Sequence, residues 1–199
     1  MKNLSDENIE SLLERAKTAE TAGQHLMAFE LFKRVSDLTT SKPVAYFRAA
    51  RNLIDLGRYA EAESFLKKKY DVPSAKRWVF EIVFGELCMA QFKPCEAERH
   101  FKTAFELNPK STSPAIFYAD CLMKQEQFQE AENVLLKALE ANGDLDEVYL
   151  NLGCAKRAIG DYQSARLYFI KACEITPDYA DASKALADVT AWLEFENCD

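Results

Sequence analysis

Small and large apolar residues recur at helical spacing in short segments separated by turn residues. The segment GDYQSARLYFIKACEITP, residues 160–177, places Ala165 and Phe169 four positions apart on one helix face. Related segments occur at 57–66 (GRYAEAESFL) and 128–135 (FQEAENVL). This i, i+4 spacing predicts amphipathic helices. With only six glycines and six prolines in 199 residues, the chain is predicted to be all-α.

The apolar pattern repeats along the chain with a fixed period. Ala165, Ala131 and Ala97 lie 34 residues apart, as do Ala62 and Ala28, with one extra residue between Ala62 and Ala97. A large residue follows each alanine by four positions: Phe32, Leu66, Phe101, Leu135 and Phe169. A small residue lies 12 positions before each alanine and is position 8 of the repeat. These residues are Ala16, Ala50, Gly85, Ala119 and Gly153. A period of this length predicts stacked structural repeats.

This pattern resembles the tetratricopeptide repeat. Five copies cover 9–42, 43–77, 78–111, 112–145 and 146–179, followed by a capping helix at 180–195, in a single domain over 1–199. The last copy matches most fully and departs at position 11, where Lys156 replaces an aromatic residue. The resemblance implies an all-α, right-handed superhelix of helix pairs. In each pair, small residues at positions 8 and 20 let the two backbones approach closely.

Turn residues agree with this division. Gly23, Gly57 and Gly160 fall between the two helices of their copies, where a left-handed residue ends a helix at low cost. The third copy has no such glycine, and Pro94 suits the first position of its second helix. In the fourth copy, the segment 141–144 (ANGD) is expected to supply a glycine stop.

Two segments allow alternative interpretations. At 67–78, Lys69 occupies a position expected to be small and one residue is inserted, so the second helix of that copy is predicted to end early. The insertion is either a neutral extension of the loop or a bend or contact site. In the capping segment, Ala182, Leu186 and Val189 share a face, and Trp192 either completes the cover or faces a partner.

The resemblance also implies where a partner would bind, because the first helices of each pair line a groove in this family. The implied groove residues are Leu13, Lys17, Phe47, Arg48, Arg51, Ile54, Ile82, Glu86, Met89, Ile116, Asp120, Met123, Leu150, Asn151 and Arg157. The position 5 residues among them either pack between neighbouring helices or form an apolar floor for a bound segment. The charges are basic toward the N-terminus and acidic in the middle.

The expected partner is another protein or a peptide segment held in this groove, in the manner of a chaperone or adaptor. Some tetratricopeptide domains grip a C-terminal carboxylate through Lys, Arg and Asn at set positions. Here those positions, counted from the first copy, hold Leu13, Lys17, Arg48, Val79 and Val83, so that ligand is not expected. The alternatives are a self-assembling homo-oligomer and an interaction domain belonging to a larger regulatory or catalytic protein.

Composition narrows the classes of function. The net charge of −7 and pI of about 5.1 argue against nucleic acid as a partner. The N-terminus has no apolar core of a signal peptide, and no apolar run is long enough for a membrane span. We therefore expect a cytoplasmic protein.

Chemistry-bearing motifs are also not evident. The six cysteines include no C-x-x-C pair, and His25 and His100 lie far apart, so we expect free thiols and no metal site. Cys154 is the best candidate for an exposed thiol. The recurrent glutamates of the second helices suit solvated surface. No phosphate loop or nucleophile motif occurs, so the chain is expected to be non-enzymatic and without a cofactor.

Overall fold

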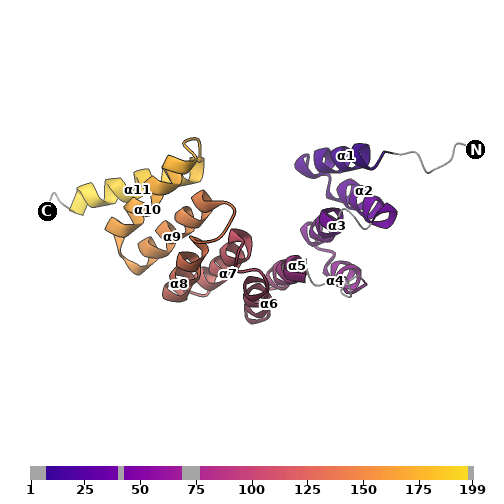
Figure 1. The fold of residues 1–199 in the computed structure, drawn as a ribbon, viewed down its shortest axis with the longest axis horizontal. Coiled ribbons are helices and arrows are strands. Elements are labelled where there is room, and N and C mark those ends of the chain that lie inside the picture. Colours follow the sequence, from indigo (N-terminus) through magenta and orange to yellow (C-terminus); the bar gives the residue numbers. More distant parts are fainter. Residues whose placement is uncertain (1–7, 40–42, 69–76, 197–199) are drawn as a thin grey trace, which may run out of the picture. The chain divides into compact units, whose positions relative to one another are not determined.

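The computed structural model describes residues 8–39, 43–68 and 77–196, and within them the chain forms eleven α-helices joined by short connections (Figure 1). The helices are α1 (Ile9–Thr21), α2 (His25–Leu38), α3 (Pro43–Asp55), α4 (Tyr59–Lys67), α5 (Arg77–Ala90), α6 (Pro94–Leu107), α7 (Thr112–Lys124), α8 (Phe128–Ala138), α9 (Leu145–Ile159), α10 (Tyr162–Ile175) and α11 (Ala180–Glu196). The prediction of an all-α fold is confirmed.

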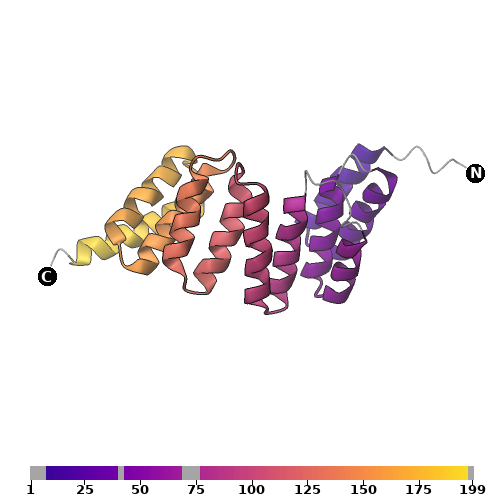
Figure 2. The ribbon, with the colours of Figure 1, turned by 60° about the horizontal axis from the view of Figure 1, so that its bottom comes forward.

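The chain divides into two compact units, residues 1–97 and 98–199, with the boundary inside α6. Unit 1 is built on α1 to α5, and unit 2 on α7 to α11. Within each unit, helices that follow one another pack side by side (Figure 2). Each unit therefore has a core that can be described by itself.

Aromatic rings form much of the core of unit 1. Tyr46 stacks on Phe65 with ring centroids 4.5 Å apart, and Phe47 meets Phe80 edge to face at 4.7 Å. Phe29 adds a further edge contact to Phe65. These rings connect α2, α3, α4 and α5, and aromatic pairs of this geometry stabilise a core beyond their buried area.

In unit 2, the closest helix contact lies between α9 and α10. Gly153 faces the fully buried ring of Phe169, and a β-carbon at Gly153 would lie 2.3 Å from that ring. Ala165, also fully buried, belongs to the same cluster. The glycine at position 8 therefore makes room for the large residue at position 24, as the repeat pattern predicts.

The last helix covers the outer side of this pair. Ala185 and Val189 of α11 join the cluster around Ala165 and Phe169, and the Trp192 ring stacks on Tyr162 with centroids 3.6 Å apart. Trp192 still exposes 37% of its surface. Of the two interpretations for Trp192, this intramolecular stacking matches the covering role.

A left-handed residue ends the first helix of all five copies. Its φ angle is 70° at Gly23, 72° at Gly57, 59° at Phe92, 61° at Glu126 and 92° at Gly160. In each turn the next residue donates its N–H to a carbonyl five positions earlier, as Asp161 does to Lys156 at 2.9 Å. This is a common way to end a helix, and two copies make it without glycine.

Two expected boundaries can be compared with the helices. α4 ends at Lys67 after nine residues, so its predicted early end is confirmed, while residues 69–76 of the segment with the one-residue insertion lie outside the described ranges. The predicted glycine stop at Gly143 is wrong, because α8 already ends at Ala138. Gly143 lies in the following loop with φ of 134°, where a β-carbon would lie 2.2 Å from Thr112 Oγ1.

The unusual Lys156 is paired across neighbouring copies. Its Nζ lies 2.9 Å from Glu132 Oε1 and 3.5 Å from Asp161 Oδ2, and the Glu132 side chain is 8% exposed. Hydrogen bonding to Glu132 raises the pKa of Lys156. The expectation that second-helix glutamates are solvated therefore fails for Glu132, because burial requires it to have a partner.

Candidate functional site: the first-helix face

The fifteen predicted groove residues differ widely in exposure. Phe47, Ile82 and Ile116 are buried, whereas Lys17 and Arg157 are exposed. The partly buried residues are Leu13, Arg48, Arg51, Ile54, Glu86, Met89, Asp120, Met123, Leu150 and Asn151. We refer to these side chains of α1, α3, α5, α7 and α9 together as the first-helix face.

In unit 1, the position 5 residues belong to the core. Phe47 is 4% exposed and packs against Phe80, while Ile82 is 2% exposed. Leu13 and Ile54 are partly buried and pack against the same cluster. Of the two interpretations for position 5, packing between helices describes Phe47 and Ile82.

The predicted basic residues of unit 1 are paired with carboxylates. Arg48 Nη1 lies 2.8 Å from Glu20 Oε2, and Arg51 Nε lies 2.8 Å from Glu86 Oε2. Burial raises the pKa of Glu86, although the charge of Arg51 and its hydrogen bond oppose the rise. The local pairs compensate the basic charge that the sequence places in this half of the face.

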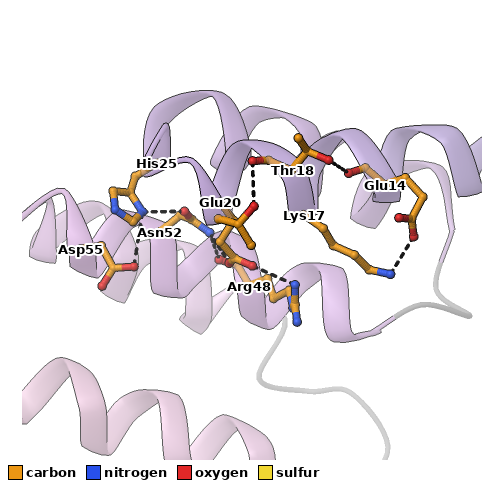
Figure 3. Close-up of polar contacts among 9 residues, drawn as sticks. Glu14, Lys17, Thr18, Glu20, His25, Arg48, Asn52 and Asp55 are labelled. Atoms are coloured by element: carbon orange, nitrogen blue, oxygen red, sulfur yellow. Dashed lines mark hydrogen bonds and ion pairs between the residues drawn. The ribbon is translucent and has the colours of Figure 1, made fainter.

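A buried amide organises the polar contacts around Arg48 (Figure 3). Asn52 is fully buried, and its Nδ2 donates to Glu20 Oε1 at 2.8 Å and to the Arg48 carbonyl at 2.9 Å. Asn52 Oδ1 lies 2.9 Å from His25 Nδ1, which is 3.5 Å from Asp55 Oδ2. With Nδ2 donating twice, the Asn52 oxygen accepts from the imidazole.

Neither Asn52 nor this contact of His25 was predicted from the sequence. The sequence offers only a polar residue at position 10, two residues after the buried position 8 and one turn after Arg48. Because Glu20 and His25 come from the preceding copy, the spacing within one copy does not identify them as partners of Asn52. The network fixes α3 against α1 and α2, and we assign it a structural role.

Unit 2 contains a pocket of about 260 Å³ between α7 and α9. Its lining residues are Ser113, Ile116, Phe117, Asp120, Glu147 and Asn151. We call it the α7–α9 pocket. Ile116, Asp120 and Asn151 were predicted, and the structure brings them together. Ser113, Glu147 and Phe117 were missed; Ser113 and Glu147 occupy position 2, a groove position of the family pattern.

Polar atoms that accept hydrogen bonds dominate this pocket. Asn151 Nδ2 donates one of its two N–H groups to the Glu147 carbonyl at 2.8 Å, which leaves this amide with its acceptor oxygen and one further N–H. Asp120 Oδ2 pairs with Lys124 at 2.7 Å. Within the described part of the chain, the Glu147 carboxylate makes no hydrogen bond or ion pair.

The surroundings of Glu147 disfavour its negative charge. Burial raises the pKa of Glu147, and the nearby carboxylates of Asp144 and Asp146 raise it further. Ile116, which is 9% exposed, and Phe117, whose ring stacks on Phe101, supply the apolar part of the lining. The pocket therefore combines an apolar wall with a carboxylate whose charge is uncompensated.

The remaining predicted residues of unit 2 lie outside the pocket lining. Leu150 packs against the cluster formed with α11, and the Arg157 guanidinium lies 5.9 Å from the centroid of the Phe169 ring. Met123 is partly buried on α7, as is Met89 of unit 1 on α5. Leu150, Arg157 and Met123 are not among the residues that line the α7–α9 pocket.

The cysteines act mainly as packing residues. Cys88 and Cys121 are buried, and burial raises the pKa of Cys121 to about 11. The expectation of an exposed thiol at Cys154 is wrong, since it is partly buried and burial raises its pKa. Among the five described cysteines, the exposed one is Cys95, in the first turn of α6. All five described cysteines are free.

The described residues offer no metal site and no membrane span. They contain no group of three His, Cys, Asp or Glu side chains that could hold a metal ion. Among the same residues, no helix has the length and apolar character needed to cross a membrane.

The pairing of helices through small residues defines this chain as an all-α protein of the helical-repeat class. Two tetratricopeptide repeat family models match it, one over residues 89–153 and the other over 43–68 and 146–179. The chain belongs to the tetratricopeptide repeat family. This is a fold of protein–protein interaction scaffolds.

The sequence identity to individual proteins is low. An uncharacterized TPR repeat-containing protein of Arabidopsis thaliana is 28% identical over 142 residues, which cover 66% of this chain. The match spans only 18% of that relative. This chain therefore corresponds to a small part of the curated protein it matches.

Solved structures share the fold at low identity. A thermophilic TPR protein of Thermus thermophilus is 19% identical, with 92% of this chain and all of that chain covered at a TM-score of 0.74. Yeast Tom70 is 18% identical, with 98% of this chain and 42% of that chain covered at 0.81. The first TPR of Spaghetti (RPAP3), bound to the HSP90 peptide SRMEEVD, is 18% identical, with 60% and 95% covered at 0.56.

Proposed function

We propose that this protein is a non-enzymatic scaffold that binds a peptide segment of another protein on its first-helix face. The observation that carries this proposal is the α7–α9 pocket, whose six lining residues all come from first helices. Its volume of about 260 Å³ lies below the roughly 300–1,000 Å³ of pockets for drug-sized ligands. It suits one side chain of a longer ligand.

The energetics favour transient binding. Fully burying one large apolar side chain contributes about 1.5–3 kcal/mol, whereas association costs roughly 4–15 kcal/mol in lost freedom and ordering. One occupied pocket cannot offset that cost, so further contacts along the face are needed. We expect dissociation constants near the micromolar range, which corresponds to about 8 kcal/mol of binding free energy.

Unit 2 is the part of the face where we expect contact. In unit 1, Phe47 and Ile82 are buried and Arg48 and Arg51 are paired with glutamates, which leaves less of that part of the face for a ligand. The α7–α9 pocket has an uncompensated carboxylate instead. We therefore do not expect the acidic end of the peptide SRMEEVD, seen with Spaghetti (RPAP3), to be held in this pocket.

Selection of peptides followed by mapping tests this proposal. Peptides of about twelve residues from a random display library would be selected on the full chain, and individual winners titrated into ¹⁵N-labelled protein. We expect saturable shifts of backbone amides in α7 and α9. Shifts confined to α8 and α10, or a selection that enriches no peptide, would contradict the proposal.

A further inference from the structure

The α7–α9 pocket has a chemical preference of its own. Its lining offers the Glu147 and Asp120 carboxylates, the Asn151 side-chain oxygen and the Ser113 hydroxyl. The two carboxylates can only accept hydrogen bonds from a ligand, and the Asn151 oxygen is a further acceptor beside the one N–H that this amide has left after donating to the Glu147 carbonyl. A complementary ligand group must therefore bring several N–H donors.

The negative charge of the pocket favours one kind of N–H donor. Asp120 already pairs with Lys124 of the same helix. Within the described residues, the carboxylate of Glu147 has no such partner. Its neighbours Asp144 and Asp146, one on the loop and one at the start of α9, add negative charge to the same place. A neutral amide would satisfy the acceptors but would leave this charge uncompensated.

The apolar wall suits the rest of a long cationic side chain. Ile116 and the partly buried ring of Phe117 line the pocket together with the polar groups. Lysine and arginine bury their aliphatic stems against apolar surface while the charged end stays with polar partners. A guanidinium or ammonium can also lie favourably over an aromatic face.

We propose that the α7–α9 pocket binds the positively charged side chain of a lysine or arginine in the bound peptide segment. This specificity rests on the proposed function, since it names the residue type that the first-helix face recognises. The partner is accordingly a protein with a basic residue in an accessible segment. Arginine is expected to bind more tightly than lysine, because its planar guanidinium can bridge the two acceptors of a carboxylate.

Variants of one library-selected peptide test this directly, because the rest of the peptide supplies the further contacts that binding needs. The probes carry arginine, lysine, citrulline, norleucine or glutamate at the position of the basic residue and are titrated into the ¹⁵N-labelled full chain. We expect arginine and lysine to shift α7 and α9 amides in a saturable way, with at least about fivefold weaker binding for citrulline and norleucine. The glutamate probe is expected to cause no saturable shift.

Two matched variants test whether the preference for a positively charged side chain depends on Glu147. Glu147→Gln removes the charge with little change of shape and should abolish the discrimination between arginine and citrulline. Glu130→Gln makes the same change at an exposed position of α8 and should leave it intact. Equal binding of arginine and citrulline, no shift with arginine, or discrimination that survives Glu147→Gln would each overturn this inference. Selected peptides that bind α7 and α9 without a basic residue would overturn it while leaving the proposed function standing.

Discussion

At the scale of single residues, position 15 of the repeat needs one backbone conformation and is filled by different residue types. Gly160 and Glu126 have φ angles of 92° and 61° in equivalent turns. A residue with a β-carbon pays about 1–2 kcal/mol for a left-handed conformation. The repeat therefore holds the backbone of Glu126 in a strained conformation, whereas Gly160 adopts the equivalent conformation without strain.

Replacing Glu126 with glycine is expected to stabilise the protein. The relieved backbone strain exceeds the entropy that glycine adds to the unfolded chain, for a net gain of about 1 kcal/mol. The matched variant Gly160→Ala should lose a similar amount, because a β-carbon there meets nothing within 4 Å and only the backbone conformation is penalised. Urea unfolding followed by circular dichroism measures the free energy of unfolding of both variants. A loss of stability in Glu126→Gly would show that the backbone of Glu126 is not strained.

Glu147 is predicted to reduce stability at neutral pH. Its pKa is raised by burial and by Asp144 and Asp146, so the folded state binds this proton more tightly than the unfolded state does. The destabilisation is present above the folded pKa and is lost as the pH falls to the ordinary carboxyl range.

Glu147→Gln should accordingly raise the free energy of unfolding at pH 7, by less than about 1 kcal/mol because the group is partly solvated. The difference from the natural chain should disappear toward pH 4. Thermal unfolding across this pH range tests the sign. Together with lost arginine binding, such a gain would mark Glu147 as a residue that favours binding over stability.

At the scale of helices, the Glu132–Lys156 pair joins α8 to α9. We expect Lys156→Tyr, which restores the aromatic residue of the family pattern, to destabilise the chain by about 3 kcal/mol, because it leaves Glu132 buried without its cation. The double variant with Glu132→Leu should recover most of that loss. Chemical unfolding of both variants measures the coupling, and a purely additive result would show that the pair does not interact.

The packing of the helices also shows how much of the structure could be predicted from the sequence. The contact of Gly153 with Phe169 follows from positions 8 and 24 of one copy, and Pro94 begins α6 as its residue type suggests. Lys156 looked like a departure because its partner Glu132 belongs to another copy. The pocket residues Ser113 and Glu147 could have been predicted, since both occupy position 2, a groove position of the family pattern. The spacing of residues in one copy predicts the packing within that copy, but it does not predict polar contacts between copies.

At the scale of the whole molecule, assembly of several chains is the alternative to binding a peptide. The stacking of Trp192 on Tyr162 and the burial of Val189 give the outer face of unit 2 an intramolecular cover. We expect size-exclusion chromatography with light scattering to give the mass of one chain, 22.6 kDa. Trp192→Asp should lower thermal stability without changing that mass, whereas an oligomer dissociated by this substitution would support assembly.

The measurement that tests the central proposal most directly compares two tryptophan variants. Asn151→Trp fills the α7–α9 pocket, whereas Asn133→Trp places the same side chain on an exposed position of α8. Fluorescence anisotropy with a labelled, library-selected peptide should show at least about tenfold weaker binding to Asn151→Trp, equivalent to about 1.4 kcal/mol. Asn133→Trp should bind as the natural chain does. Equal affinity for all three proteins, or a loss only in Asn133→Trp, would contradict binding on the first-helix face.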